Sequence, residues 1–247
     1  MDLGSGAWLE RWAAASWPAA EVRQSSGWLL RHTPGVRRRR SNSALPPAPA
    51  DSPQDTIAVV EAFYRERGLP VVVQVSPAEQ HAALDAALAD RGYDTDRPTL
   101  VLTAPLSQVT AATDGPPATV TVAERLTDQW RVAFDPNGDN AAVCDQVLAR
   151  IPMPAGFATA VLDGEPAGIG LLTAGEGWVG VYCMATVAQH RRKGVATAIL
   201  HAGARWAASR GAERAYLQVE QDNAGARALY RTAGFTLSHR YHYRTAS

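Results

Sequence analysis

The pattern of apolar and polar residues is clearest after residue 118, where short apolar runs alternate with amphipathic segments. Short apolar runs predict strands, and apolar residues spaced three and four apart predict helices. The pattern predicts strands at Thr119–Ala123, Phe157–Asp163, Ala167–Ala174, Trp178–Val187, Arg214–Glu220 and Phe235–Tyr243. It predicts helices at Thr127–Phe134, Asn140–Ile151, Arg192–Ser209 and Asn223–Thr232. Asp163-Gly164 is a favourable hairpin turn, so the second and third strands should pair.

The first half of the chain contains a fainter copy of the end of this pattern. Arg67–Val75 is similar to Arg210–Val219, and Ala82–Tyr93 is similar to Gly225–Phe235. Each pair of segments then leads into a predicted strand. A repeat of this size indicates two similar α/β units in one chain.

Two polar or proline-containing stretches interrupt the predicted strands and helices. Ser107–Ala118 is small, polar and contains prolines, so it predicts a linker. The expected organisation is therefore a first unit at 1–106, a linker at 107–118 and a second unit at 119–247. Ser41–Pro53 is rich in proline and is expected to be a loop.

Composition narrows the class of protein without naming a function. The formal net charge is zero and the sequence pI is about 7, so nothing favours nucleic acid or an anionic membrane as a partner. The two cysteines, Cys144 and Cys183, form neither a metal-binding cluster nor a disulfide framework. No signal peptide or membrane span is expected, and a cytoplasmic location fits best. The chain has a single lysine, Lys193.

That lysine lies in the segment Arg191-x-x-Gly194-x-Ala196, which follows a predicted strand and opens a predicted helix. A helix N-terminus presents unpaired N–H groups and the positive end of the helix dipole, which together bind phosphate. Gly194 allows the backbone to approach a ligand closely. Arg191, Arg192 and Lys193 would add positive charge. A solvated basic turn is the alternative interpretation of this segment alone.

A second motif follows one strand later. Asn223, Ala226 and Tyr230 stand three and four residues apart, so they share one face of the predicted helix. Asn223 or Asp222 could cap this helix. The small Ala226 leaves room for a ligand, and Tyr230 places a phenol beside that room. A cap and an ordinary packing residue are the alternative interpretation.

The two motifs in this order resemble the GCN5-related N-acetyltransferase (GNAT) superfamily. The resemblance covers Trp178–Tyr243, with Met184-Ala185-Thr186-Val187 ahead of the loop and Leu217-x-Val219 between the motifs. Arg192 stands where the family most often has glycine, and Ala188 replaces a frequent proline. The resemblance implies an α/β (α+β) fold with a mixed, mostly antiparallel sheet flanked by helices.

The first half resembles a degenerate second GNAT unit, as in tandem-GNAT proteins of actinobacteria. Its segment corresponding to the phosphate loop, Ser41–Ser52, has no glycine, so no cofactor is assigned to it. Trp28-Leu29-Leu30-Arg31 and Arg40-x-Asn42-Ser43 are also similar to that group. The second unit is expected to pack on the first as an internal pseudo-dimer, giving either a monomer or a homodimer.

The resemblance also implies a reaction, acetyl transfer from acetyl-CoA as co-substrate to a small-molecule or peptidyl amine, with no metal. The cofactor-binding residues it implies are Met184, Ala185, Thr186, Arg191, Arg192, Lys193, Gly194, Val195, Ala196, Thr197, Asn223, Ala226 and Tyr230. Tyr230 matches the family's general acid.

The remaining roles are less constrained. Glu220 is the first candidate base, ahead of Glu176 and Asp222. Cys183 is more plausible as a small buried residue than as a nucleophile, and His190 as loop surface than as a ligand contact. Two further functions stay open, a CoA-binding module without catalysis and an acyltransferase that uses another acyl-CoA.

Overall fold

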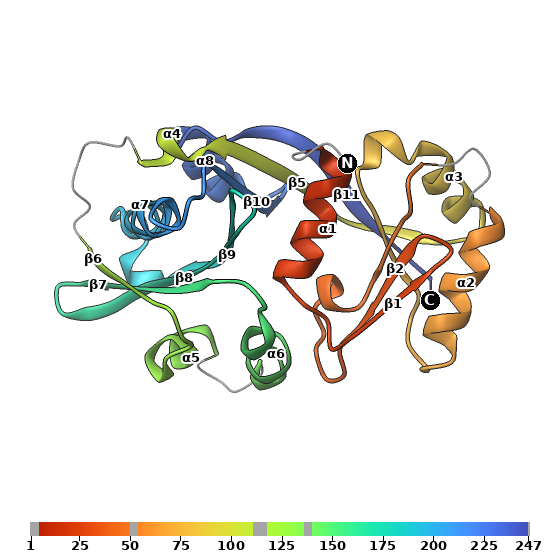
Figure 1. The fold of residues 1–247 in the computed structure, drawn as a ribbon, viewed down its shortest axis with the longest axis horizontal. Helices are drawn as coiled ribbons and strands as arrows, with labels where there is room; N and C mark the ends of the chain where they lie inside the picture. The colour runs from red at the N-terminus through yellow and green to blue at the C-terminus, as the bar shows by residue number, and fades with distance from the viewer. Residues whose placement is uncertain (1–4, 50–53, 111–117, 136–139, 247) are drawn as a thin grey trace. The chain divides into compact units, whose positions relative to one another are not determined.

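The computed structural model describes residues 5–49, 54–110, 118–135 and 140–246, shown in Figure 1. The chain divides into two compact units. Unit 1 comprises Met1–Val101 and Ser238–Ser247, and unit 2 comprises Leu102–Leu237. The last strand therefore belongs mainly to unit 1, although it follows unit 2 in the sequence. The predicted domains at 1–106 and 119–247 stay a prediction.

Unit 1 contains a sheet covered by helices. Its elements are α1 (Gly6–Ser16), β1 (Glu21–Ser25), β2 (Trp28–His32), η1 (Arg39–Ser41), β3 (Ala44–Leu45), α2 (Gln54–Arg65), β4 (Val72–Val75), η2 (Ala78–Gln80), α3 (Ala82–Asp90), β5 (Asp94–Pro105) and β11 (Thr236–Thr245). β5 and β11 each run over the boundary between the units. β1, β2 and β3 pair antiparallel, β3 and β4 pair parallel, and β4 pairs antiparallel with β11.

One local prediction in this unit is wrong. The expected loop at Ser41–Pro53 begins with the last residue of η1 and contains β3, which pairs with β2 and β4. Its last part lies outside the described residues. The many prolines of this stretch favoured a loop. The strand β3 has only two residues, which is too short to show a period of its own.

A buried chain of polar side chains links four elements of unit 1. On β2, Arg31 is fully buried and donates to Gln74 Oε1 of β4 at 2.7 Å. Gln74 in turn donates to Glu10 Oε2 of α1 at 2.7 Å, and Glu10 Oε1 lies 2.9 Å from His239 Nε2 of β11. Burial lowers the pKa of Arg31. Buried polar groups of this kind require such partners, because an unpaired one costs free energy.

Unit 2 contains a five-stranded arrangement of antiparallel and parallel strands. Its elements are α4 (Leu106–Thr110), β6 (Thr119–Ala123), α5 (Asp128–Phe134), α6 (Ala141–Gln146), η3 (Leu148–Arg150), β7 (Ala155–Leu162), β8 (Glu165–Gly175), β9 (Trp178–Thr186), η4 (Ala188–His190), α7 (Val195–Ala208), β10 (Arg214–Glu220) and α8 (Ala224–Thr232). β6, β7, β8 and β9 pair antiparallel in that order, and β9 pairs parallel with β10. α7 covers one face of this sheet, while α5 and α6 lie on the other (Figure 1).

Most strands and helices predicted after residue 118 are confirmed. The turn between β7 and β8 has φ values of 54° at Asp163 and 84° at Gly164, which suits a hairpin. The predicted helix at Asn140–Ile151 instead breaks at Val147 into α6 and η3. The predicted linker begins inside α4, and residues 111–117 lie outside the described part of the chain.

The two units repeat one order of elements. β1, β2, β3, α2, β4, α3 and β5 follow one another in unit 1 as β7, β8, β9, α7, β10, α8 and β11 follow one another from residue 155 onward. A parallel pairing falls at the same place in each series, β3 with β4 and β9 with β10. The repeat seen in the sequence is thus accompanied by a repeat in topology.

α7 lies close against the sheet because Gly203 has no side chain. A Cβ atom at this position would stand 2.2 Å from Leu172 Cδ2 of β8. Gly225 of α8 is also helical, yet the nearest atom to its Cβ position is Asn223 Oδ1 at 4.0 Å. The two helical glycines therefore differ in the space around them.

We expect Gly203→Ala to lower the free energy of unfolding by about 1–3 kcal/mol, because the new methyl overpacks the α7–β8 contact. The matched change Gly225→Ala should raise it by about 0.5–1 kcal/mol through higher helix propensity. Urea unfolding of both variants measures the difference. Equal effects at the two positions would contradict the packing argument.

Candidate active site

β9 and β10 separate partway along their length. Their parallel register runs from Trp178 opposite Arg214 to Val181 opposite Leu217 and ends there. β9 nevertheless continues to Thr186, and β10 to Glu220. Backbone groups of the two strands beyond this point no longer pair with each other. Buried or half-buried backbone groups need partners, so the gap can accept an extended ligand.

A β-bulge shapes β9 within the same stretch. Ile169 pairs with Ala185 and Leu171 with Tyr182, so Cys183 and Met184 together oppose Gly170. Cys183 has a φ of 50°, in the left-handed region that non-glycine residues seldom adopt. Bulges redirect the backbone next to active sites. The half-buried Cys183 side chain is part of this bulge, a geometry that the sequence pattern did not predict.

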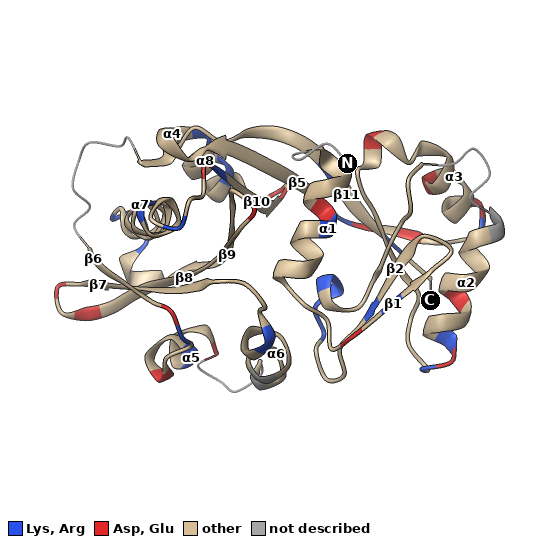
Figure 2. Ribbon diagram, in the orientation of Figure 1, with Lys and Arg blue, Asp and Glu red and all other residues tan. Residues whose placement is uncertain are grey.

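The predicted phosphate loop connects η4 to α7. Arg191, Arg192, Lys193 and Gly194 are all exposed, and basic residues are visible beside α7 in Figure 2. Gly194 has a φ of 77° and ends the loop, so α7 begins at Val195 and not at the predicted Arg192.

The first turn of α7 leaves its N–H groups without helical partners. Ala198 is the first residue of α7 whose backbone N–H forms a hydrogen bond to the loop. It donates to the Gly194 carbonyl oxygen at 2.9 Å. The N–H groups of Val195, Ala196 and Thr197 precede the first intrahelical bond. This end of α7 therefore has the geometry and the charge to hold a phosphate group.

α8 presents the second motif. The Asn223 side chain caps the helix by accepting from the Ala226 N–H at 3.0 Å, so Asn223 and not Asp222 is the cap. Ala226 is half-buried, and Tyr230 is buried with its ring 5.8 Å from that of Phe235. Burial raises the pKa of Tyr230 to about 12, so its hydroxyl keeps its proton at neutral pH.

The three candidate carboxylates lie in different places. Glu220 is exposed at the end of β10, where that strand has already separated from β9. Asp222 is exposed just before α8. Glu176 lies in the turn between β8 and β9, next to the pair Gly175–Trp178 at the opposite end of β9. The fold therefore separates Glu176 from the gap by the paired stretch Trp178–Val181 of β9.

Two residues of interest were not anticipated correctly. His190, expected on the loop surface, is buried, and its Nδ1 has no hydrogen-bond partner among the described residues. Trp130 of α5 is fully buried and donates to the Gly170 carbonyl at the bulge, at 3.1 Å. No pattern in the sequence indicated which groups either side chain would face.

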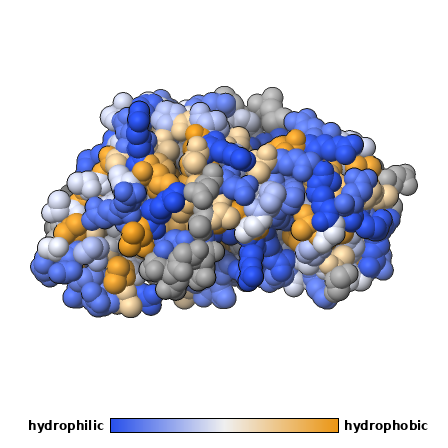
Figure 3. Space-filling model, turned by 90° about the horizontal axis from the view of Figure 1, so that it is seen from below, coloured by the Kyte–Doolittle hydropathy of each residue, from blue (hydrophilic) through white to orange (hydrophobic). Residues whose placement is uncertain are grey.

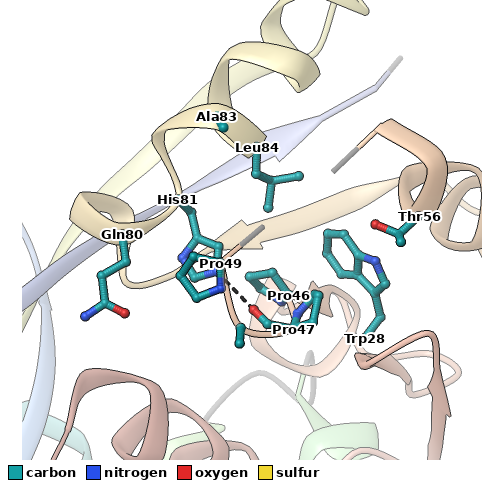
Figure 4. A pocket seen from close by; sticks show the side chains of 10 residues that line it. Trp28, Pro46, Pro47, Pro49, Thr56, Gln80, His81, Ala83 and Leu84 are labelled. Carbon is teal, nitrogen blue, oxygen red and sulfur yellow. Dashed lines mark hydrogen bonds between the residues drawn. The ribbon is translucent and has the colours of Figure 1, made fainter. Parts of the chain in front are cut away.

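Prolines line the corresponding region of unit 1 (Figure 4). Pro46, Pro47 and Pro49 follow β3, and His81 Nε2 lies 3.1 Å from the Pro47 carbonyl oxygen. They enclose, with Trp28 and Leu84 among others, a cavity of about 60 Å³. Ligand sites commonly measure about 300–1,000 Å³.

The described residues include no group of three or more histidine, cysteine, aspartate or glutamate side chains placed to hold a metal ion. Among those residues, no helix is both long enough and apolar enough to cross a bilayer. On the face seen in Figure 3, hydrophobic residues are interspersed with hydrophilic ones.

Comparison with known proteins shows the family to which the chain belongs. The family model described as "Probable histone acetyltransferase Rv0428c C-terminal" matches residues 7–244. A curated Bacillus subtilis protein, "Uncharacterized N-acetyltransferase YobR", is 30% identical over 247 residues that cover 96% of each chain.

Solved structures share the fold. A GCN5-related N-acetyltransferase from Kribbella flavida has a TM-score of 0.72 at 15% identity, covering 98% of this chain and 96% of its own. A tandem GNAT protein from the clavulanic acid biosynthesis pathway has a TM-score of 0.64 at 17% identity, covering 88% of this chain and 73% of its own. The chain belongs to the GNAT superfamily, within the family that the matching model describes, and it is an N-acetyltransferase.

The phosphate loop also contains a residue in a costly conformation. Arg192 has a φ of 63°, which explains why glycine is common at this position in the family. The neighbouring Arg191 has an ordinary φ of −63°.

We expect Arg192→Gly to leave the protein about 1 kcal/mol more stable than Arg191→Gly, because only the first change removes left-handed strain. Each variant loses one exposed arginine from the same loop, so the charge change is matched. Thermal or urea unfolding provides the comparison. If Arg191→Gly were the more stable variant, the left-handed φ of Arg192 would not lower the stability of the protein.

Proposed function

We propose that unit 2 transfers an acetyl group from acetyl-CoA, its co-substrate, directly to a primary amine of a small molecule or peptide. The observation that carries this proposal is the separation of β9 from β10 beside the uncapped first turn of α7. The two features lie at the same end of β9, since η4 and the phosphate loop follow Thr186 directly. We also propose one acyl-CoA site per chain, because prolines occupy the corresponding region of unit 1.

The residues present fit acetyl-CoA. The N–H groups from Arg192 to Thr197, with Arg191 and Lys193 beside them, would hold the pyrophosphate. The unpaired edge of β9 at Met184, Ala185 and Thr186 would hold the pantetheine arm. Asn223 and Ala226 of α8 would border it from the other side.

Acetyl-CoA would supply an activated acetyl thioester. A backbone N–H within Met184–Thr186 would polarise the thioester carbonyl, which is an oxyanion-type role. The bulge at Cys183 turns this stretch away from ordinary strand pairing, so its N–H groups are not committed to β10. We assign Cys183 no nucleophilic role, because direct attack by the amine needs none.

Tyr230 would donate a proton to the departing thiolate. Its pKa of about 12 keeps the phenol protonated throughout the neutral and mildly alkaline range. Its position in α8, one face with Asn223 and Ala226, puts it beside the proposed ligand path.

The attacking amine must lose a proton. A primary amine of pKa about 10 is about 0.1% neutral at pH 7, which costs roughly 4 kcal/mol. Glu220 would accept that proton directly or through water, because β10 ends with this residue in the gap.

Turnover with a panel of amines tests the proposal. The protein is incubated with acetyl-CoA and each amine, and free CoA thiol is followed with time. Thiol release that depends on an amine supports acetyl transfer. Binding of CoA without release would contradict it, and release only from longer acyl-CoA donors would contradict the choice of acetyl.

We expect Tyr230→Phe to lower kcat by about 10²–10⁴-fold, because it removes the proposed general acid. The dissociation constant for CoA should stay close to that of the native chain. Tyr93→Phe is a matched control, since Tyr93 is another buried tyrosine, in unit 1, whose hydroxyl bonds to Glu61. A native kcat for Tyr230→Phe would exclude the acid role.

We expect Glu220→Gln to lower kcat/KM at pH 7, with a deficit that shrinks as the pH approaches the amine pKa of about 10. The reason is that the amine then loses its proton without help. Asp222→Asn and Glu176→Gln are controls of the same charge. A larger loss for Asp222→Asn than for Glu220→Gln would transfer the base role to Asp222.

A further inference from the structure

Gly170 of β8 is confined from two sides. A Cβ atom at this position would stand 2.6 Å from Ile199 Cγ2 of α7 and 2.9 Å from Met184 Sδ of β9. Gly170 also has no partner in the β9 register, because Cys183 and Met184 bulge opposite it. The bulge therefore depends on a glycine that lies directly beneath α7.

The carbonyl of Gly170 bonds to the helix on the other face of the sheet. Trp130 of α5 donates its indole N–H to this oxygen at 3.1 Å, within a fully buried contact. A carbonyl left unpaired by a bulge would cost free energy in such a place, and the indole N–H removes that cost.

Other contacts fix the Trp130 ring. It stacks on Phe134 with centroids 5.0 Å apart and meets Phe157 edge-on at 5.4 Å. Its own backbone N–H bonds to the Thr127 hydroxyl, which caps α5, at 3.2 Å. The ring is thus held by its helix, by β7 and by β8, and has little freedom to follow a moving carbonyl.

We propose that Trp130 is a positioning residue for acyl transfer. Its N–H holds the Gly170 carbonyl, and so holds the bulge that aims the N–H groups of Met184–Thr186 at the thioester. The same bond ties α5 to β8 at the point opposite the bulge of β9, so a change in α5 reaches the reacting strand through Gly170. This inference rests on the proposed function of that strand.

The test is Trp130→Phe, which keeps an aromatic ring and removes the N–H. Trp178→Phe is the matched control, because Trp178 is buried at the other end of β9, where that strand pairs with both neighbours. Hydrogen–deuterium exchange of residues 182–186 reports on the bulge without any reaction. We expect Trp130→Phe, and not Trp178→Phe, to speed this exchange by roughly tenfold.

Kinetics provide the second measurement. For Trp130→Phe we expect kcat to fall by about ten- to a hundredfold. The dissociation constant for CoA should stay within about twofold, because α5, which carries Trp130, and α7 lie on opposite faces of the sheet (Figure 1). A merely structural role would instead lower stability and active fraction while leaving kcat per active site unchanged.

The outcomes separate the two proposals. Exchange and kcat equal to those of Trp178→Phe would overturn the positioning role, as would a loss of CoA affinity as large as the loss of kcat. A native protein that binds CoA but acetylates no amine would overturn the proposed function, while the exchange comparison would still decide whether Trp130 holds the bulge. If Trp130→Phe does not fold, site-specific 3-benzothienylalanine at this position removes the N–H with the ring shape kept, and the same results are expected.

Discussion

The end of pairing between β9 and β10 is the constraint on which the rest of unit 2 depends. A parallel pair inside a sheet normally continues, because each unpaired N–H or carbonyl that is removed from water costs free energy. Here the register stops at Val181 and Leu217, and both strands run on. The bulge at Cys183, the glycine opposite it and the buried indole beneath it all accommodate that departure.

The other features of unit 2 are arranged around this gap. α7 follows β9 through η4 and the phosphate loop, so its unbonded N–H groups lie at the same end of the strand, while α8 follows β10 and carries Tyr230. Burial of the Tyr230 phenol keeps it protonated, and exposure of Glu220 keeps a carboxylate in contact with water. In the proposed reaction, the buried phenol would be the acid and the exposed carboxylate the base for direct transfer between a thioester and an amine.

The fold of unit 1 requires the C-terminal strand, β11. β4 has β11 as its antiparallel neighbour, with Val72 opposite Thr245, and Glu10 meets His239 at 2.9 Å. These contacts join residues that are far apart in sequence, and such contacts form late because they close long loops. Unit 1 therefore cannot complete its sheet or its buried polar chain before the C-terminal strand has been synthesised.

The sequence by itself determined most strands and helices after residue 118, the phosphate loop and the Asn223–Tyr230 helix face, because each is encoded by neighbours a few residues apart. It also carried Arg192 at a position where glycine is common, and the left-handed φ of this residue explains that preference for glycine. Only the tertiary structure decided where β9 leaves β10 and that β11 pairs with β4. It also decided that two residues at the Pro-rich stretch form β3 and that Trp130 faces the bulge. These are choices of pairing partner, and pairing joins segments whose separation in the chain leaves no mark on local periodicity.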